Sequence, residues 1–390
     1  MEKNLDQGRH VTWLENFYDL IVVVVVAQVS VNLSHDVSVF GFISFIALYI
    51  PIWWSWVGVT FYATRFEIDD LGHRLLILLQ IAASAYMAIN VPRGLGEDSS
   101  GFALSYAVIR IILVIEYIRI RRLAPAAGQL IKRYSVGFSI AAVLWFVSAF
   151  IPPPFRFIFW IIGLVIDISI PLIFIRSISI KYAPDIHHLP ERFGAFTIIV
   201  LGISILGVVN GISNHNWSTN SIIDAGLGLG IAFSLWWVYF DRVDGAEIKA
   251  LRGANRFGVY IAWLYIHFPL IIGFTALGVS IEHIVLSDQN ITLPLAEKWL
   301  LCISVSICLF AISIIDITTE KSKDFSSNIS LIKKYSISIY GIMAAIIVII
   351  IATIDMSILP VSLMSAMAII CIGQVVLDIR RHPHHRIFKL

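Results

Sequence analysis

The chain has 390 residues and a net charge of +2 at pH 7, with 58% hydrophobic and 14% charged side chains. Soluble globular proteins carry about 25% charged and about 45–50% apolar residues, so this composition excludes soluble domains, nucleic-acid binding modules and secreted disulfide scaffolds. The small net charge gives no support to a polyanionic partner, and we expect the surplus apolar surface to face membrane lipids.

Long apolar stretches fill most of the chain. A helix that crosses the hydrocarbon core of a bilayer needs about 20 mainly apolar residues. Twelve stretches meet this requirement: 12–33, 39–62, 75–91, 101–118, 135–151, 155–175, 193–213, 221–240, 257–281, 295–315, 336–354 and 358–378. They are continuous rather than alternating, which favours helices over barrel strands. The sequence therefore predicts an all-α polytopic membrane protein with about twelve transmembrane helices.

The distribution of basic residues predicts the orientation of these spans, because Lys and Arg mark the cytoplasmic side. The two termini and the connections at 63–74, 119–134, 176–192, 241–256 and 316–335 contain 24 Lys and Arg residues. The connections on the opposite side contain three, and Arg110 lies inside a predicted span. We expect both termini to be cytoplasmic and the number of spans to be even.

Two pairs of short motifs recur at nearly the same distance along the chain. Glu15-Asn16-Phe17 opens the first span and Glu191-Arg192-Phe193 opens the seventh, while Tyr62-x-x-Arg65 follows the second span and Tyr239-x-x-Arg242 follows the eighth. Duplicated halves are common in membrane transporters. The motifs predict two parallel six-helix repeats, residues 1–178 and 179–390. Duplication within one chain favours a self-sufficient monomer, and a homodimer stays open.

Ionisable residues inside the predicted spans are the best candidates for function, because each is costly in lipid and needs a partner or water. Asp19, Arg110 and Asp167 all lie roughly 10–12 Å from the cytoplasmic edge, given a rise of about 1.5 Å per residue. We predict that these three form a charge-compensated cluster that binds a solute or ion. Glu15, one turn from Asp19, and Glu116 would line a vestibule beside it. The alternative is an Arg–carboxylate clamp that only holds helices together.

The second half contains fewer charges within its predicted spans. His267 in the ninth span is its main candidate, since histidine titrates near neutral pH, although a lone histidine in a span is more often a hydrogen-bonded structural residue. A further group of charged residues is predicted to form the cytoplasmic rim: Arg65, Glu191, Arg192, Asp241 and Arg242. Glu15 and Glu191 have a simpler explanation as acidic residues that stabilise the starts of helices.

The sequence contains no recognisable cofactor or metal motif. Cys302, Cys308 and Cys371 all lie within apolar stretches and show no ligand spacing, so we interpret them as small apolar residues. There is no nucleotide fingerprint, metalloprotease HExxH motif or haem ligand pair. We therefore expect neither a cofactor nor a metal site.

Several sequence blocks resemble those of the bacterial low temperature requirement protein A family, most clearly between about residues 10 and 285. The blocks are Thr12-Trp13-Leu14-Glu15-Asn16-Phe17-Tyr18-Asp19-Leu20, Arg65-Phe66-Glu67 with Asp69-Asp70, Glu191-Arg192-Phe193-Gly194 with Thr197-Ile198-Ile199-Val200-Leu201-Gly202, Leu235-Trp236-Trp237-Val238-Tyr239-Phe240-Asp241, and His267-Phe268-Pro269-Leu270. The resemblance implies a multi-pass protein of the bacterial inner membrane and brings no substrate or reaction with it. The family usually has a glutamate where this chain has Ile203.

Three functions are consistent with these residues. The first is a transporter of a small solute or ion that uses the charged cluster. The second is a cation channel-like pore lined by the first and seventh spans, with residues 22–26 as a hydrophobic constriction. The third is a membrane enzyme that acts on lipid head groups at the cytoplasmic rim through Glu15, Glu191 and the neighbouring arginines. We favour the transporter, because six-span repeats and compensated charge at one depth are typical of carriers.

Overall fold

The computed structural model describes residues 11–66, 68–174, 188–213, 219–243, 246–248, 257–288, 290–321, 331–354 and 357–381. Both terminal segments, Glu67 and much of the basic connections used to predict orientation lie outside these residues. The cytoplasmic placement of the termini therefore stays a prediction.

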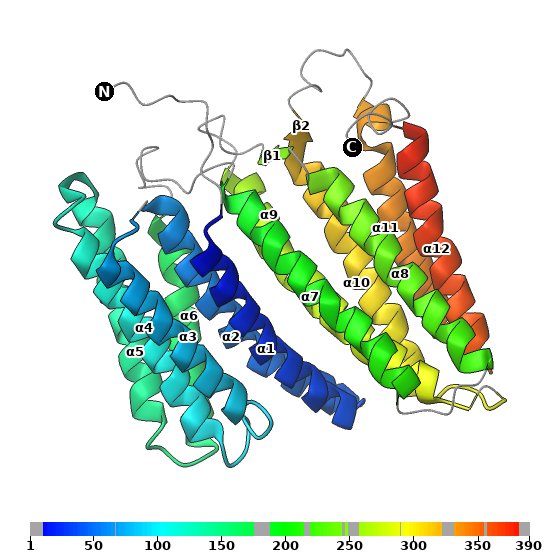
Figure 1. Cartoon of the computed structure of the whole chain (residues 1–390), viewed down its shortest axis with the longest axis horizontal. Coiled ribbons are helices and arrows are strands. Elements are labelled where there is room, and N and C mark those ends of the chain that lie inside the picture. The colour runs from blue at the N-terminus through cyan, green and yellow to red at the C-terminus, as the bar shows by residue number, and fades with distance from the viewer. Residues whose placement is uncertain are drawn as a thin grey trace. The chain divides into compact units, whose positions relative to one another are not determined.

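Each of the twelve predicted spans is a helix in the part of the chain that the structure describes (Figure 1). The helices are α1 (Trp13–His35), α2 (Val39–Arg65), α3 (Leu71–Asn90), α4 (Ser99–Ile120), α5 (Gly128–Ser148), α6 (Phe155–Phe174), α7 (His188–Ser213), α8 (Thr219–Val243), α9 (Phe257–Leu286), α10 (Leu295–Thr318), α11 (Leu331–Thr353) and α12 (Pro360–Arg381). All twelve are long and apolar enough to cross a membrane. The predicted all-α membrane fold is confirmed.

Several helices extend beyond the apolar stretches that predicted them. The most consequential case is α7, which begins at His188 rather than near residue 193. Pro190 is tolerated there because the N–H groups of the first turn have no intrahelical acceptor. Glu191 lies in the same turn, where an acidic side chain is favoured by the helix dipole. The earlier start places Arg192 inside the helix rather than before it.

One feature of the fold was not predicted. Strands β1 (Ala246–Ile248) and β2 (Thr319–Lys321) form an antiparallel two-stranded ladder that pairs Ala246 with Lys321 and Ile248 with Thr319. Three residues are too few to show the alternating hydrophobicity that identifies a strand in a sequence. The ladder joins the segment that follows α8 to the segment that follows α10.

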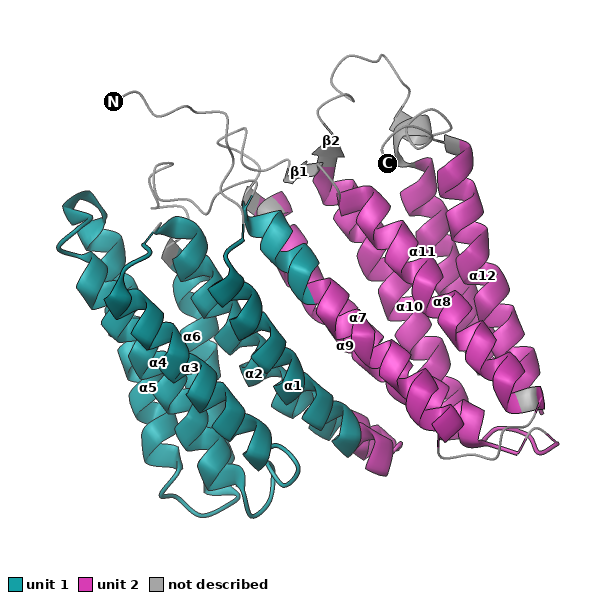
Figure 2. Cartoon of the chain, in the orientation of Figure 1, with its two compact units in different colours: residues 1–32, 43–196 teal, residues 33–42, 197–390 magenta. Residues whose placement is uncertain are grey.

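The chain divides into two compact units (Figure 2). Unit 1 consists of residues 1–32 and 43–196, and within it α4 packs against α3 and α5, and α5 packs against α6. Unit 2 consists of residues 33–42 and 197–390, and within it α10 packs against α9 and α11, and α8 packs against α12. The six-helix repeats at 1–178 and 179–390 remain a prediction.

The outer faces of the helices are apolar. Ile161 on α6, Ile346 on α11 and Ile369 on α12 are each more than half exposed, as are many other aliphatic side chains of the described helices. Apolar patches of this extent are not stable in water and are typical of surfaces that lipid covers. The helices therefore bury polar side chains and expose apolar ones, as a membrane protein requires.

Glycines allow α7 and α9 to approach closely within unit 2. A Cβ atom added at Gly207 would lie 2.0 Å from the backbone oxygen of Gly278, and one added at Gly278 would lie 2.7 Å from the backbone oxygen of Ile203. These contacts are with backbone atoms, which cannot rotate away. Small residues at such crossings are characteristic of packed transmembrane helices.

We expect Gly207→Ala to destabilise the protein by about 1–3 kcal/mol, because the new methyl group would force α7 and α9 apart. Gly202→Ala is the matched control in the same helix, since a Cβ atom at Gly202 would meet nothing within 4 Å. Thermal unfolding in detergent measures both variants. Equal unfolding temperatures for the two would show that the α7–α9 crossing is not tight.

Candidate functional site

The first buried ion pair of unit 1 joins α1 to α7. Arg192 Nη2 and Trp56 Nε1 each donate a hydrogen bond of 2.7 Å to Oδ1 of Asp19. Asp19, Arg192 and Trp56 are all fully buried. The carboxylate therefore ties together three helices, since Trp56 belongs to α2.

Glu15 lies one helical turn before Asp19 and extends this cluster. Its Oε2 atom accepts hydrogen bonds from the backbone N–H and the hydroxyl of Thr12, at 2.8 and 3.0 Å, which closes the start of α1. The same oxygen is 3.6 Å from Nε2 of His188 and 4.0 Å from Nη1 of Arg192. The first two turns of α7 thus face two carboxylates of α1.

Aromatic packing holds the start of α7 in place. The ring of Trp56 stacks on Phe196 with a centroid separation of 4.1 Å and an interplanar angle of 22°. Phe193 meets the same indole ring edge-on at 4.9 Å. Such contacts bury large apolar areas and orient the indole N–H toward Asp19. Arg192 is consequently positioned by its neighbours along α7 as well as by its ion pair.

The second buried ion pair joins α4 to α6. Arg110 Nε is 2.7 Å from Oδ2 of Asp167, and both side chains are fully buried. The Tyr106 hydroxyl donates to the same Asp167 oxygen and accepts from Arg110 Nη2 at 3.0 Å. Arg110 Nη2 also donates to the backbone oxygen of Trp54 at 2.8 Å. This pair therefore also includes three helices, with α2 as the element common to both pairs.

The local sequence explains how a guanidinium fits into this packed region. Tyr106 and Arg110 are four residues apart on α4 and so share one helix face. Gly58 on α2 supplies the space, because a Cβ atom there would lie 2.3 Å from Nη1 of Arg110. The Arg110 side chain also lies over the rings of Tyr106 and Phe138, at 5.0 and 5.5 Å from their centroids.

Both ion pairs leave buried polar atoms without a hydrogen-bond partner among the described residues. These atoms are Oδ2 of Asp19, Oδ1 of Asp167, Nη1 of Arg110, and Nε and Nη1 of Arg192. A buried polar atom without a partner costs about 1–3 kcal/mol, and more if it is charged. Buried polar atoms left in this state in a folded protein are uncommon and call for an explanation.

Tyr18 is buried close enough to both pairs to interact with each through its charge distribution. It precedes Asp19 on α1, is only 1% exposed, and interacts electrostatically with Arg110 as well as with Asp19 and Arg192. The two pairs therefore share one buried neighbour. We refer to Asp19, Arg192, Arg110, Asp167 and Tyr18 below as the paired-charge site.

The predicted cluster is reproduced in part. Arg110 and Asp167 are in direct contact, as the equal-depth argument predicts. Asp19, however, contacts Arg192 rather than Arg110, and Arg192 is fully buried rather than at the rim. The reason is the early start of α7, which carries the guanidinium to the level of Asp19. The apolar stretch alone did not reveal this extension.

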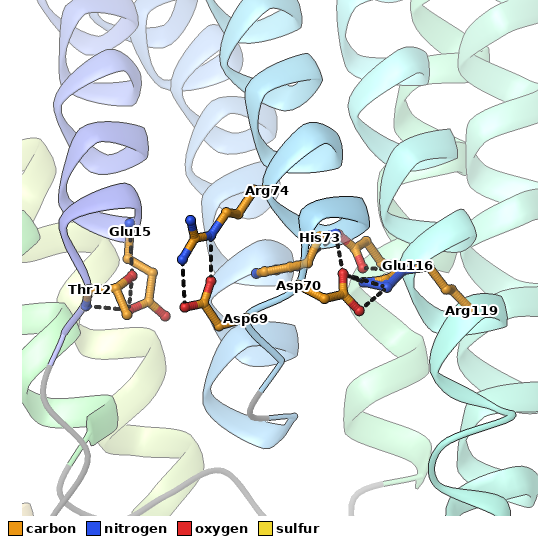
Figure 3. A network of polar contacts seen from close by, with 8 residues as sticks. All are labelled: Thr12, Glu15, Asp69, Asp70, His73, Arg74, Glu116 and Arg119. Carbon is orange, nitrogen blue, oxygen red and sulfur yellow. Dashed lines mark hydrogen bonds and ion pairs between the residues drawn. The ribbon is translucent and has the colours of Figure 1, made fainter.

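Glu116 belongs to a separate polar network, which includes Asp70, His73 and Arg119 (Figure 3). His73 Nδ1 donates to Oε1 of Glu116 at 2.9 Å, and Arg119 Nη2 donates to Oδ1 of Asp70 at 2.7 Å. Asp70 also caps the start of α3, since its Oδ1 atom accepts from the backbone N–H of His73 at 2.8 Å. We call Asp70, His73, Glu116 and Arg119 the rim network.

The remaining rim residues of unit 1 have different environments. Arg74 forms a two-pronged ion pair with Asp69, in which both side chains are more than half exposed. Glu191 is exposed, in agreement with a role at the helix start. Arg65 is half-buried and donates to the hydroxyl groups of Tyr117 and Tyr134 at 3.4 and 3.3 Å.

His267 in unit 2 is fully buried. Its Nδ1 atom is 2.7 Å from the backbone oxygen of Trp263, which requires a proton on Nδ1, and its Nε2 atom is then the acceptor for the Tyr239 hydroxyl at 3.3 Å. Both ring nitrogens are therefore engaged by neighbours within the unit. This geometry favours the structural interpretation of His267.

Unit 2 contains the predicted rim residues Asp241 and Arg242, and also two buried acidic residues that sequence reasoning missed, Asp224 and Asp378. Arg242 lies 3.7 Å from Asp378 in a buried ion pair, whereas Asp241 is half-buried. Asp224 near the start of α8 is fully buried. Asp224 stands inside a predicted span and was detectable by the same depth argument that identified Asp19. Ile203, at the position of the family glutamate, is an ordinary buried apolar residue.

Twelve apolar helices with buried ion pairs and lipid-exposed aliphatic faces define a multi-pass α-helical membrane protein. The family model for the bacterial low temperature requirement A protein matches residues 10–377, and the chain belongs to this family. It is also similar to a protein of Rhizobium meliloti (strain 1021) described as uncharacterized protein RA0937. The two are 27% identical over 297 residues, which cover 71% of this chain and 70% of that relative. The family suggested by the sequence blocks is thus confirmed.

We expect Asp19→Asn or Arg192→Gln alone to lower stability by about 3–5 kcal/mol, because each leaves a buried charge without its partner. The double variant removes both charges and should be more stable than either single variant. Thermal unfolding of the purified protein in detergent measures the three. Asp69→Asn is the matched control, since an exposed pair contributes about 0–1 kcal/mol. A double variant whose loss equals the sum of the two single losses would contradict the pairing.

Proposed function

We propose that this protein transports a small solute or ion across the membrane and that the paired-charge site binds or couples the transported species. The single observation that carries this proposal is the state of Asp19 and Asp167. Each is a fully buried carboxylate in a membrane-spanning helix that is paired through one oxygen to a fully buried arginine, and Oδ2 of Asp19 has no hydrogen-bond partner among the described residues. Ionised side chains inside a membrane are costly and tend to mark transport pathways.

A purely structural clamp would be expected to satisfy its own polar atoms. Buried ion pairs are stable only when further hydrogen bonds occupy the remaining lone pairs and protons. Here Oδ2 of Asp19, Nε of Arg192 and Nη1 of Arg110 have no hydrogen-bond partner within the described part of the chain. The carboxylate oxygen can take up a proton or a cation, and the guanidinium N–H groups can donate to an anion or to a polar group of a solute, which supports a binding role over a clamp.

The composition of the paired-charge site also supports this role. It contains two acidic groups, two guanidinium groups and a tyrosine, so it offers donors and acceptors in similar number. A species that binds one member of a pair releases the other, and each pair joins different helices: α1 with α7, and α4 with α6. Exchange of partners would therefore change which helices are held together, and carriers need this kind of coupling between binding and helix movement.

Electrical recording on proteoliposomes adsorbed to a solid-supported membrane tests the proposal. Rapid exchange to solutions that differ in H⁺, Na⁺, K⁺, Cl⁻ or a panel of amino acids supplies the probes. The wild-type protein should give a transient current with at least one probe. Asp19→Asn and Arg110→Gln should reduce that current about tenfold or more, since each removes a hydrogen-bonded charge. Asp69→Asn changes an exposed carboxylate and should leave the current unchanged.

The other two candidate functions predict different results. Discrete single-channel openings in a planar bilayer would identify a pore, and protein-dependent turnover of lipid head groups would identify an enzyme. Wild-type proteoliposomes that give no current above protein-free liposomes with any probe, and no uptake of labelled solute, would contradict the transport proposal.

A further inference from the structure

We infer that an aromatic cluster in unit 1 is the gate between the paired-charge site and the Lys/Arg-rich end of the unit, and that Arg65 holds this gate closed. This inference rests on the proposed transport function and specifies its access route. The cluster consists of Tyr62 and Phe66 of α2, Tyr117 of α4, and Tyr134 and Phe138 of α5. We call these five residues the aromatic gate.

Three helices place the aromatic gate at the same level, next to the paired-charge site. On α4, Tyr117 follows Arg110 by two turns toward the rim network, a rise of about 10 Å. On α2, Tyr62 is one turn beyond Gly58, which contacts Arg110. On α5, which runs the opposite way, Tyr134 lies one turn closer to the rim than Phe138, and Phe138 contacts the Arg110 guanidinium.

The flanking side chains follow the same order. Leu113 of α4 and Ile170 of α6 are buried members of the same cluster, and Ile170 is one turn beyond Asp167. A Cβ atom at Gly58 would lie 3.0 Å from Leu113, which places Leu113 at the deep side of the gate beside Arg110. The same order is therefore found along each helix toward the Lys/Arg-rich end. A residue of the Arg110–Asp167 pair, or a residue that contacts Arg110, comes first, and the buried apolar and aromatic side chains of the cluster follow it.

Contacts between the aromatic rings close the gate at this depth in unit 1. The Tyr117 ring is in contact with the rings of Tyr62, Phe66, Tyr134 and Phe138, at centroid distances of 5.1, 6.0, 5.6 and 5.9 Å. All five aromatic residues are at most 5% exposed. A buried layer of touching rings excludes water and ions, and hydrophobic constrictions of this kind gate membrane proteins. Tyr117 is the centre of the layer.

Arg65 spans the gate at its rim side. Its guanidinium donates to the hydroxyl groups of Tyr117 and Tyr134 and lies 4.9 Å from the centroid of the Tyr134 ring. Arg65 is on α2, Tyr117 on α4 and Tyr134 on α5, so one side chain links the three helices that form the layer. These hydrogen bonds are long, and the arginine is only half-buried. The hydrogen bonds can therefore break without leaving the Arg65 guanidinium buried away from water.

The same residues allow the gate to open. The layer is held by ring contacts, by hydrogen bonds from one arginine and by the hydrogen bond of 3.2 Å that the Tyr62 hydroxyl donates to the backbone oxygen of Glu116, which joins α2 to α4. The rim network beyond it joins the start of α3 to α4, through His73 with Glu116 and Asp70 with Arg119. Separation of α5 from α2 and α4 would therefore open the layer without breaking the rim network. The Arg110 guanidinium would then be reachable past Phe138.

Cysteine accessibility tests this inference directly. The background protein has Cys302, Cys308 and Cys371, all in unit 2, replaced by alanine. The probe is Leu113→Cys at the deep side of the gate, and a membrane-impermeant methanethiosulfonate reagent is applied to inside-out vesicles. In the background protein the probe should react slowly. Arg65→Ala should accelerate the reaction about tenfold, the effect of losing hydrogen bonds from a charged group.

Matched variants keep the result interpretable. Arg74→Ala removes an arginine at the same end whose partner is the exposed Asp69, so it should leave the rate unchanged. Tyr134→Phe keeps the ring but removes one acceptor, so it should give a smaller acceleration than Arg65→Ala even if the latter folds poorly. Leu123→Cys, an exposed position, should react rapidly in every background.

Two outcomes would overturn the inference. One is a Leu113→Cys rate as fast as that of Leu123→Cys in the background protein, which would show that the layer is open. The other is an unchanged rate in both Arg65→Ala and Tyr134→Phe. Because no transported species is needed, the gate is measured even if the current recordings fail, and a closed, Arg65-dependent layer without any current would reject the transport function alone.

Discussion

The burial of ionised side chains is the constraint on which the architecture of unit 1 depends. A carboxylate or guanidinium within a membrane-spanning helix must be neutralised nearby, and the nearest source of opposite charge is another helix. Asp19 is neutralised by α7, and Asp167 is neutralised by α4. Both arrangements also engage α2, through the Trp56 indole and the Trp54 backbone oxygen. The polar contacts therefore specify which helices are neighbours, a task for which apolar packing in lipid provides little discrimination.

Much of the fold was predictable because the bilayer imposes a length on each helix. The twelve stretches were visible as runs of apolar residues, and a constant rise per residue was enough to place Arg110 and Asp167 at one level. The same reasoning failed for Arg192, since the polar start of α7 does not look like part of a span. Helix ends are set by capping and by tertiary contacts such as that of Trp56 with Phe196, and neither is readable from hydropathy.

Other parts of the site depend on contacts between residues far apart in the chain. The hydroxyl of Tyr106 could have been suspected, because it lies four residues before Arg110 on one helix face. Tyr117, Tyr134 and Phe138 gave no comparable signal, since aromatic residues in transmembrane helices are ordinary and their convergence requires knowledge of helix packing. Glu116 shows the converse, because its position suggested that it lines a vestibule beside the cluster whereas the structure pairs it with His73.

The placement of Tyr106 has a consequence for how the second pair can respond to protonation. Its oxygen receives N–H groups from Arg110 while its own hydrogen points to Asp167. The O–H bond of Tyr106 is thereby held in one orientation, pointing away from Arg110 and toward Asp167. If Asp167 acquired a proton on its accepting oxygen, that oxygen would become a donor and a weaker acceptor, and the Tyr106 hydroxyl would be held less firmly. A change in the ionisation of Asp167 would thus alter the hydrogen bond of Tyr106 and, through the same hydroxyl oxygen, its hydrogen bonds with Arg110.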